Sequence, residues 1–224
     1  MNDPSQPLLD YAHESSFESA LIAVGIEPKD AERACFAVWP ALVARYHEAH
    51  RTYHNLSHID AMLDDLGSVN VGLIEGKIEW IELAIWFHDV IYDPRSATNE
   101  ADSARWVESK LGAYLDPSDL DEIQRLILAT QHCQSRTDAA DELLLVDIDL
   151  AILGATDIRV YHAYSEAIRR EFCHVPLDAY QTGRIAVLQN FLDRDRIYLT
   201  KAFEGLEDLA RRNVAQEIDR LAKG

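Results

Sequence analysis

The fold of this 224-residue chain is decided by residues 81–92, which read Ile81-Glu82-Leu83-Ala84-Ile85-Trp86-Phe87-His88-Asp89-Val90-Ile91-Tyr92. A helix with this sequence is apolar on nearly every side, and such a helix is expected in the middle of a protein. The imidazole of His88 and the carboxylate of Asp89 would be costly to bury unless they are paired or bind a cation. The stretch therefore predicts a central helix that carries a buried ion pair or a metal site.

Further residues of metal-ligand type lie on either side of this helix. His58 precedes the His88-Asp89 pair by roughly 30 residues and Asp149 follows it by roughly 60, each beside an apolar and helical stretch. A His-Asp dipeptide alone is a weak signal. The order His, His-Asp, Asp is more specific, because it is the pattern of several helices that converge on one ion.

Four stretches carry a resemblance to a known family, and they read Arg51-Thr52-Tyr53-His54-Asn55-Leu56-Ser57-His58-Ile59, Trp86-Phe87-His88-Asp89-Val90-Ile91-Tyr92-Asp93-Pro94, Asn99-Glu100-Ala101-Asp102-Ser103-Ala104 and Asp147-Ile148-Asp149-Leu150-Ala151-Ile152-Leu153-Gly154. With these motifs the chain resembles the HD superfamily of metal-dependent phosphohydrolases, and within it a group of small bacterial proteins. The motifs span about residues 50–155, and the resemblance continues in residues 161–170 and around Arg184.

The resemblance implies an all-α protein with a single HD-type helical domain over residues 1–224. Its metal-binding region would cover about residues 50–155, and its C-terminal helices about residues 157–222. The implied metal ligands are His58, His88, Asp89 and Asp149. Asp149 is preferred to Asp147 because the last ligand of the family resembles the second Asp of an Asp-x-Asp run, which leaves Asp147 as a cap or as an acceptor that orients a ligand.

Two imidazoles and two carboxylates favour one divalent transition metal ion, Mn, Fe, Ni, Co or Zn, over Ca. Such an ion lowers the pKa of a bound water and polarises a phosphoryl oxygen. The chain is therefore expected to be an enzyme that hydrolyses a phosphoester or phosphoanhydride of a small phosphorylated metabolite, above all a nucleotide, by metal-activated water. Two alternatives remain: a non-catalytic module that retains the metal site to sense a nucleotide or bind a partner, and a di-iron oxygenase, which would need two ions.

The candidate catalytic residues are Asp89 and Glu100. Glu100 either serves as an acid/base partner near the ion or stabilises the start of its own helix through the helix dipole. The better-known nucleotidases of the superfamily carry an acidic residue one helical turn after the His-Asp pair, where this chain has Tyr92 and Asp93. The identity of the general base is therefore left open.

The candidate substrate-binding residues are His54, His132 and Arg184. His54 is expected one helical turn before His58 and on the same face, where it either contacts a substrate phosphate, forms a hydrogen bond with a metal ligand, or has a plain surface role. His132 could contact substrate or begin a second metal site, but one histidine in that region favours a mononuclear site. Arg184 could clamp a phosphate group, and the other cations considered for this role are Arg169, Arg170 and Lys201.

The charge of the chain limits the kinds of partner that it is expected to bind. The chain has 21 basic and 39 acidic residues, and its net charge is -18. Nucleic acid is not expected as a partner, because most of this surface would repel it. A small phosphorylated molecule can still bind, since a local ion and a few arginines dominate the field at short range.

The three cysteines Cys35, Cys133 and Cys173 lack Cys-x-x-Cys spacing, which fits free thiols in a reducing compartment. The first residues lack the basic start and apolar core of a signal peptide. No uncharged run approaches the ~20 residues of a membrane span. We therefore expect a soluble cytoplasmic protein without a membrane partner.

Caps and helical periodicity predict helices along most of the chain, and the motifs quoted above lie on or beside them. Residues 143–146 alone could form a buried strand, but their continuation to Leu153 favours a helix. The expected helices cover residues 17–24, 28–46, 56–67, 77–92, 98–112, 117–130, 143–153, 157–172, 177–192 and 200–222.

Overall fold

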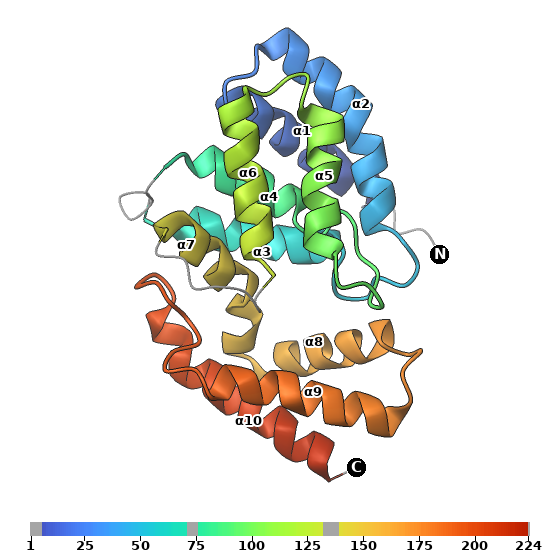
Figure 1. Cartoon of the computed structure of the whole chain (residues 1–224), viewed down its shortest axis with the longest axis vertical. Coiled ribbons are helices and arrows are strands. Elements are labelled where there is room, and N and C mark those ends of the chain that lie inside the picture. The colour runs from blue at the N-terminus through green and yellow to red at the C-terminus, as the bar shows by residue number, and fades with distance from the viewer. Residues whose placement is uncertain (1–5, 71–75, 132–138, 224) are drawn as a thin grey trace. The chain divides into compact units, whose positions relative to one another are not determined.

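The computed structural model describes residues 6–70, 76–131 and 139–223, and the side chains from residue 13 onward within these ranges. In this part of the chain the regular structure is helical, with ten α-helices and no strand (Figure 1), so the all-α prediction is confirmed. None of the helices in these ranges is long and apolar enough to cross a membrane. The helices are α1 (Gln6–Ala23), α2 (Pro28–Tyr46), α3 (Leu56–Ser68), α4 (Ile78–Phe87), α5 (Asn99–Leu111), α6 (Pro117–Ala129), α7 (Ala140–Asp149), α8 (Ile158–Glu171), α9 (Leu177–Leu192) and α10 (Glu207–Ala222), with short 3-10 turns η2 (Ala151–Gly154) and η3 (Glu204–Leu206).

Local signals set most helix limits. Pro28 stands at the start of α2, and the side chain of Asn55 caps α3 by accepting a hydrogen bond from the amide of Ser57 at 2.9 Å. Asp157 caps α8 in the same way, through the amide of Arg159. Gly25, with φ of 119°, reverses the chain after α1, a conformation that favours glycine. Each of these ends was readable from the sequence.

α7 covers Ala140–Asp149 instead of residues 143–153, and the 3-10 turn η2 follows it. Three other helices differ from the expectation. α1 begins well before Phe17, and α4 ends at Phe87 instead of Tyr92. Beyond α4, the hydroxyl of Ser103 on α5 accepts a hydrogen bond from the backbone nitrogen of Ile91 at 3.1 Å. The same hydroxyl donates to the carbonyl oxygen of Ile91 at 3.3 Å. These groups are then not available for a continued helix.

The third difference is the start of α10. It begins at Glu207 rather than Thr200, because the Asp147 carboxylate accepts hydrogen bonds from the amides of Leu199 and Thr200. In both corrected helix ends a side chain that is remote in sequence competes with the helical hydrogen bonds.

The chain divides into two compact units, and it passes between them more than once. The first unit comprises residues 1–48 and 74–134, and the second comprises residues 49–73 and 135–224. Both units are therefore built from two separate segments of the chain. The single domain that the resemblance implies is not confirmed by this division.

The first unit contains α1, α2, α4, α5 and α6. In this unit α5 and α6 lie side by side (Figure 1) and pack on α4. The side chains from Leu83 to Phe87 are fully buried, as the apolar sequence of α4 predicts. Trp86 lies edge to face against Trp39 and Phe17, with ring centroids 5.6 and 6.0 Å apart. The centre of this unit is therefore an aromatic core around α4.

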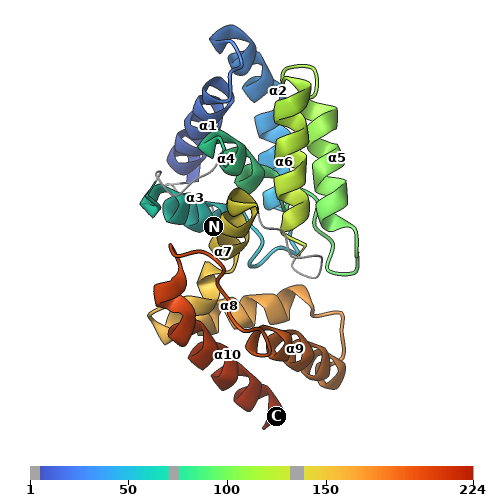
Figure 2. The ribbon, with the colours of Figure 1, turned by 60° about the vertical axis from the view of Figure 1, so that its left-hand side comes forward.

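The second unit contains α3 and α7 to α10, and in it α9 and α10 pack together (Figure 2). The turn η2 packs closely on the following segments, and Gly154 makes this possible: a Cβ atom there would lie 2.7 Å from Cβ of Leu206 and 2.9 Å from the hydroxyl of Tyr198. Asn213 on α10 donates to the carbonyls of Leu153 and Ala155 at 2.9 and 3.0 Å. These contacts hold the end of α7 in place.

Candidate functional site

His88 is the first residue after α4, and its side chain is buried in the first unit. Its Nδ1 lies 3.0 Å from the carbonyl oxygen of Ile85. A carbonyl can only accept a hydrogen bond, so Nδ1 carries the proton and, in the neutral ring, Nε2 presents a lone pair. This is the ring state and the backbone hydrogen bond that orient a metal-binding histidine.

The lone pair of His88 faces a carboxylate. Nε2 of His88 lies 3.2 Å from Oδ2 of Asp89, whose side chain is 13% exposed. Two acceptors at this distance repel each other unless a proton or a cation lies between them. Two ligands bound about 2.0 to 2.2 Å from one ion, at an angle of about 100°, are themselves about 3.2 Å apart. The pair therefore fits an ion bound by both residues.

A second pair of the same kind lies in the second unit. His58 on α3 is buried, and its Nε2 is 3.1 Å from Oδ1 of Asp149, the last residue of α7. The ring of Tyr53 lies against that of His58, with centroids 4.8 Å apart. Each unit thus holds one buried histidine beside a carboxylate, and both residue types are metal ligands.

Asp147 has a different role from Asp149. Its fully buried carboxylate accepts hydrogen bonds from the amide of Leu199 and from both the amide and the hydroxyl of Thr200, at 2.6 to 3.0 Å. Burial raises the pKa of this carboxyl, although these hydrogen bonds act in the opposite direction. Asp147 is an acceptor, as expected, but the group that it orients is the chain before η3 rather than a histidine.

His54 lies before α3 rather than on it. The helix begins at Leu56, so the expectation that His54 is one helical turn from His58 is wrong; the reason is that Asn55 caps the helix. Nδ1 of His54 is instead 2.6 Å from Oε2 of Glu171 at the end of α8. Contact between His54 and substrate stays a prediction.

Glu171 was not identified from the sequence. Its other oxygen, Oε1, accepts hydrogen bonds from the amides of Thr52, Tyr53 and His54 at 2.8, 2.7 and 3.0 Å. Burial alone would raise the pKa of Glu171, but the hydrogen bonds from His54 and these amides outweigh it and lower the pKa to about 2. Glu171 therefore holds the loop that leads into α3 and His58.

Arg184 is buried among partners in the second unit. Its Nε donates to Oε1 of Glu217 at 2.9 Å, and its terminal nitrogen donates to the hydroxyl of Tyr164 at 3.1 Å. Burial alone would lower the pKa of Arg184, but Tyr164 and Glu217 outweigh it and raise the pKa. A phosphate group could reach the guanidinium only by competing with Glu217, so the structure gives Arg184 a structural role; its contact with substrate stays a prediction.

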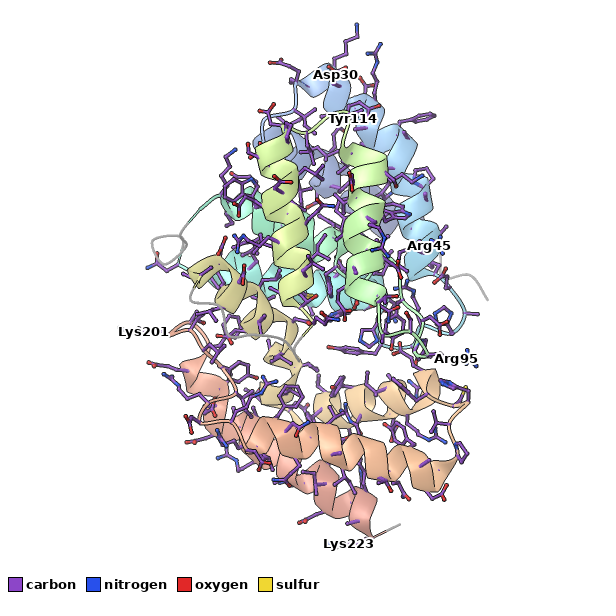
Figure 3. The ribbon with its side chains drawn as sticks, in the orientation of Figure 1. Asp30, Arg45, Arg95, Tyr114, Lys201 and Lys223 are labelled. Carbon is purple, nitrogen blue, oxygen red and sulfur yellow. The ribbon has the colours of Figure 1, made fainter. Side chains whose placement is uncertain are left out.

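Glu100 lies in the first turn of α5 and is half-buried, and its acid/base role stays a prediction. The neighbouring Asn99 has a structural function, because its side-chain amide bonds both the nitrogen and the oxygen of Asp93 at 3.0 Å. His132 lies outside the described residues. Lys201, another cation considered from the sequence, is exposed (Figure 3).

A pocket of about 640 Å³ opens in the second unit beside the His58–Asp149 pair. One wall is the loop and helix around Tyr53 and His58, a second wall is the end of α7 with η2, and a third is a stripe along α8 that runs from Val160 to Arg170. The volume lies in the range of small-molecule sites. A small molecule in this pocket would lie next to one of the two His–Asp pairs.

No family model, curated protein or solved structure matches this chain. Membership in the HD superfamily therefore stays an expectation that four short motifs carry. The contacts of the two His–Asp pairs and of the pocket do not depend on it.

Proposed function

We propose that this protein is an HD-type metal-dependent phosphohydrolase that cleaves a phosphoester or phosphoanhydride of a small phosphorylated metabolite, with nucleotides as the first class to test. The observation that carries the proposal is the recurrence of one arrangement: Nε2 of a buried histidine lies 3.1 Å from a carboxylate oxygen in one pair and 3.2 Å in the other. Each pair is stable only with a proton or a cation between its two members, and a divalent cation would satisfy the nitrogen and the carboxylate of a pair together.

His58, His88, Asp89 and Asp149 are the proposed ligands of one divalent ion. His88 supports the assignment best, because its Nδ1 donates to the carbonyl of Ile85 while its Nε2 points to the carboxylate of Asp89. The two nitrogens and two carboxylates suit Mn, Fe, Co, Ni or Zn. When bound, the ion would activate water and polarise a phosphoryl oxygen.

The residues of the chain contribute binding and orientation. The pocket beside His58 and Asp149 admits a small molecule to these ligands. Glu171 fixes the loop that carries Tyr53, and the Tyr53 ring lies against His58, so the imidazole has a fixed aromatic neighbour. With a net charge of -18, the protein gains substrate affinity from short-range contacts rather than from long-range attraction.

The test begins with protein stripped by a chelator and reloaded with Mn, Co, Ni or Zn. We expect phosphate or pyrophosphate to be released from members of a panel of nucleotides and sugar phosphates only after reloading. In oxygen-18 water the label should enter the released phosphate or pyrophosphate, because water attacks phosphorus. Asp89→Asn and Asp149→Asn should abolish turnover, whereas Asp121→Asn, at an exposed carboxylate on α6 of the first unit, serves as the control.

Two outcomes would overturn the proposal. Fully metal-loaded protein that cleaves no phosphate ester or anhydride in the panel is not a phosphohydrolase. If such protein nevertheless binds a nucleotide in a metal-dependent way, the regulatory module becomes the better description.

A further inference from the structure

We propose that the pocket of the second unit takes a singly phosphorylated small molecule with a planar ring, and that Arg170 is the residue that contacts its phosphate. The proposal deepens the proposed function by naming the substrate class, and it rests on that function for the phosphoryl chemistry alone. It moves the phosphate contact from Arg184 to a residue that lines the pocket.

Arg170 differs from the other arginines around it in what its guanidinium binds. Arg169 donates to the carbonyls of Phe172 and Val175, and Arg220 donates to the hydroxyl of Ser165 at 2.6 Å. Arg184 is held by Glu217 at 2.9 Å. Arg170 forms no side-chain hydrogen bond or ion pair with another residue in the described ranges, and it faces the pocket. Its donors remain available for an anionic ligand.

The position of Arg170 on α8 directs it toward the His58 end of the pocket. Side chains of a helix lean toward its N-terminus, so Arg170 lies back over the turn that contains Ala167. The carbonyl of Ala167 accepts a hydrogen bond from the hydroxyl of Thr52 at 2.6 Å. The next residue, Tyr53, packs its ring 4.8 Å from that of His58. One short loop therefore connects the helical turn at Ala167, which precedes Arg170, to the proposed metal ligand.

The rest of the pocket fits a flat organic group. The rings of Tyr53 and Tyr164 meet edge to face at 4.7 Å, and both residues line the pocket. Four alanines, Ala151, Ala155, Ala163 and Ala167, also line the pocket, together with larger apolar side chains such as Ile152, Val160 and Leu206. Aromatic edges and faces beside small side chains leave room for a planar ring and favour its stacking.

The charges of the lining favour one phosphate over several. Among the described residues of the pocket, Arg170 is the one Arg or Lys, whereas Asp65 and Asp149 contribute carboxylates. Burial and, after it, the neighbouring Asp64 raise the pKa of Asp65, so carboxylates already crowd this wall. A triphosphate would bring charge that this lining does not compensate.

The test uses phosphonates, which bind like phosphate monoesters but cannot be hydrolysed. Binding of benzylphosphonate, methylphosphonate and a nucleoside triphosphate to the full chain is measured by calorimetry, with Mn²⁺ and with chelator. We expect benzylphosphonate to bind more tightly than either other probe. Arg170→Ala should weaken it by about 10- to 100-fold, the range for a hydrogen bond to a charged group.

Two further variants separate the contacts. Arg159→Ala removes one positive charge from the same helix at a residue that pairs with Asp157 and does not line the pocket, so binding should stay within about twofold. Ala163→Trp adds a ring at an exposed position of the lining and should block benzylphosphonate more than methylphosphonate.

Equal binding by the parent and Arg170→Ala overturns the proposal, as does tighter binding of the triphosphate or absence of binding by benzylphosphonate. If Arg170-dependent binding is found but metal-loaded protein cleaves no phosphate ester, the inference stands and the proposed hydrolysis fails. If hydrolysis is found but Arg170→Ala leaves both KM and phosphonate binding unchanged, the hydrolase stands and the inference fails.

Discussion

The two units of this protein are stabilised by different interactions. The first unit has an aromatic core, and all four tryptophans, Trp39, Trp80, Trp86 and Trp106, belong to it. The second unit contains no tryptophan and buries the carboxylates of Asp147, Glu171 and Glu217, each of which accepts several hydrogen bonds. Apolar packing is non-directional and independent of pH, whereas a carboxylate fixes chosen donors and does so only while it is ionised.

The difference bears on the candidate site. In the first unit, His88 follows a helix buried on all sides, and its ring is oriented by its own backbone through Ile85. In the second unit, a loop precedes the helix of His58, and the amides of this loop donate hydrogen bonds to Glu171 at the C-terminal end of α8. The unit that carries the pocket thus places its loops by directional, charge-assisted hydrogen bonds, which are the more precise way to position irregular chain.

The largest expected effect tests whether the two His–Asp pairs serve one ion. The parent should bind about one divalent ion per chain, and His58→Ala and His88→Ala should each weaken binding by more than about 100-fold, because even the outer partners of metal ligands typically contribute 10- to 100-fold. Metal content is measured by elemental analysis after dialysis. His47→Ala, at an exposed histidine of the first unit, is the control.

If each unit held an ion of its own, the parent would bind two ions and each single variant would keep one. That outcome would show that the two His–Asp pairs bind separate ions, and the proposal of one shared ion would be wrong.

The second prediction concerns Arg184 as a structural residue of the second unit. Arg184→Ala leaves the fully buried carboxylate of Glu217 without its cation and should lower the free energy of unfolding by about 3 to 5 kcal/mol. The double variant Arg184→Met with Glu217→Leu should recover most of this loss, because no buried charge remains. Urea denaturation followed by circular dichroism measures both. Equal stability of Arg184→Ala and the parent would show that the pair is not stabilising and would return Arg184 to the list of substrate contacts.

The third prediction uses acid to distinguish the units. The pKa of Glu171 is about 2 in the folded protein and 4.5 in its unperturbed state. Because the folded value is the lower one, the ionised carboxyl stabilises the fold above pH 4.5 and this contribution, about 3 kcal/mol at about 1.4 kcal/mol per unit, is lost as the pH falls toward 2. Glu217, whose pKa is also lowered, acts in the same direction, and Asp147, whose pKa is raised, opposes them.

As the pH falls, helix content should therefore decrease before tryptophan fluorescence changes, since the tryptophans report on the first unit. In the Glu171→Gln variant the pH midpoints of helix content and of tryptophan fluorescence should lie closer together, because the stability of the variant no longer depends on the titration of Glu171. Coincident curves that Glu171→Gln leaves in place would show that aromatic packing and buried carboxylates do not divide the molecule as described.

The smallest expected effect is that of a helix cap in the second unit. Asn55→Ala removes the acceptor for the Ser57 amide at the start of α3 and should cost about 1 kcal/mol. Asn55→Asp retains a capping oxygen and should stay close to the parent. Urea midpoints measure the two variants. A loss for Asn55→Ala as large as that for Arg184→Ala would mean that the cap, rather than the buried ion pair, limits the stability of this unit.

Sequence alone determined the helical class, the limits of α2 and α9, the cap at Asn55 and the residue types of both His–Asp pairs. Periodicity, caps and helix breakers depend on residues within about one helical turn of each other, so they can be recognised from the sequence alone. An adjacent pair such as His88-Asp89, at the end of a fully apolar helix, is recognisable for the same reason.

Only the tertiary structure decided where α4 ends, what Asp147 and Glu171 hold, and which arginine lines the pocket. Glu171 finds the amide of His54 across 117 residues, and Arg184 finds Glu217 across 33. An arginine on an amphipathic helix has the same local sequence signals whether it faces a ligand or a buried carboxylate. The choice between Arg170 and Arg184 was therefore made by packing, because the partner of each side chain is brought to it only when remote segments of the chain meet.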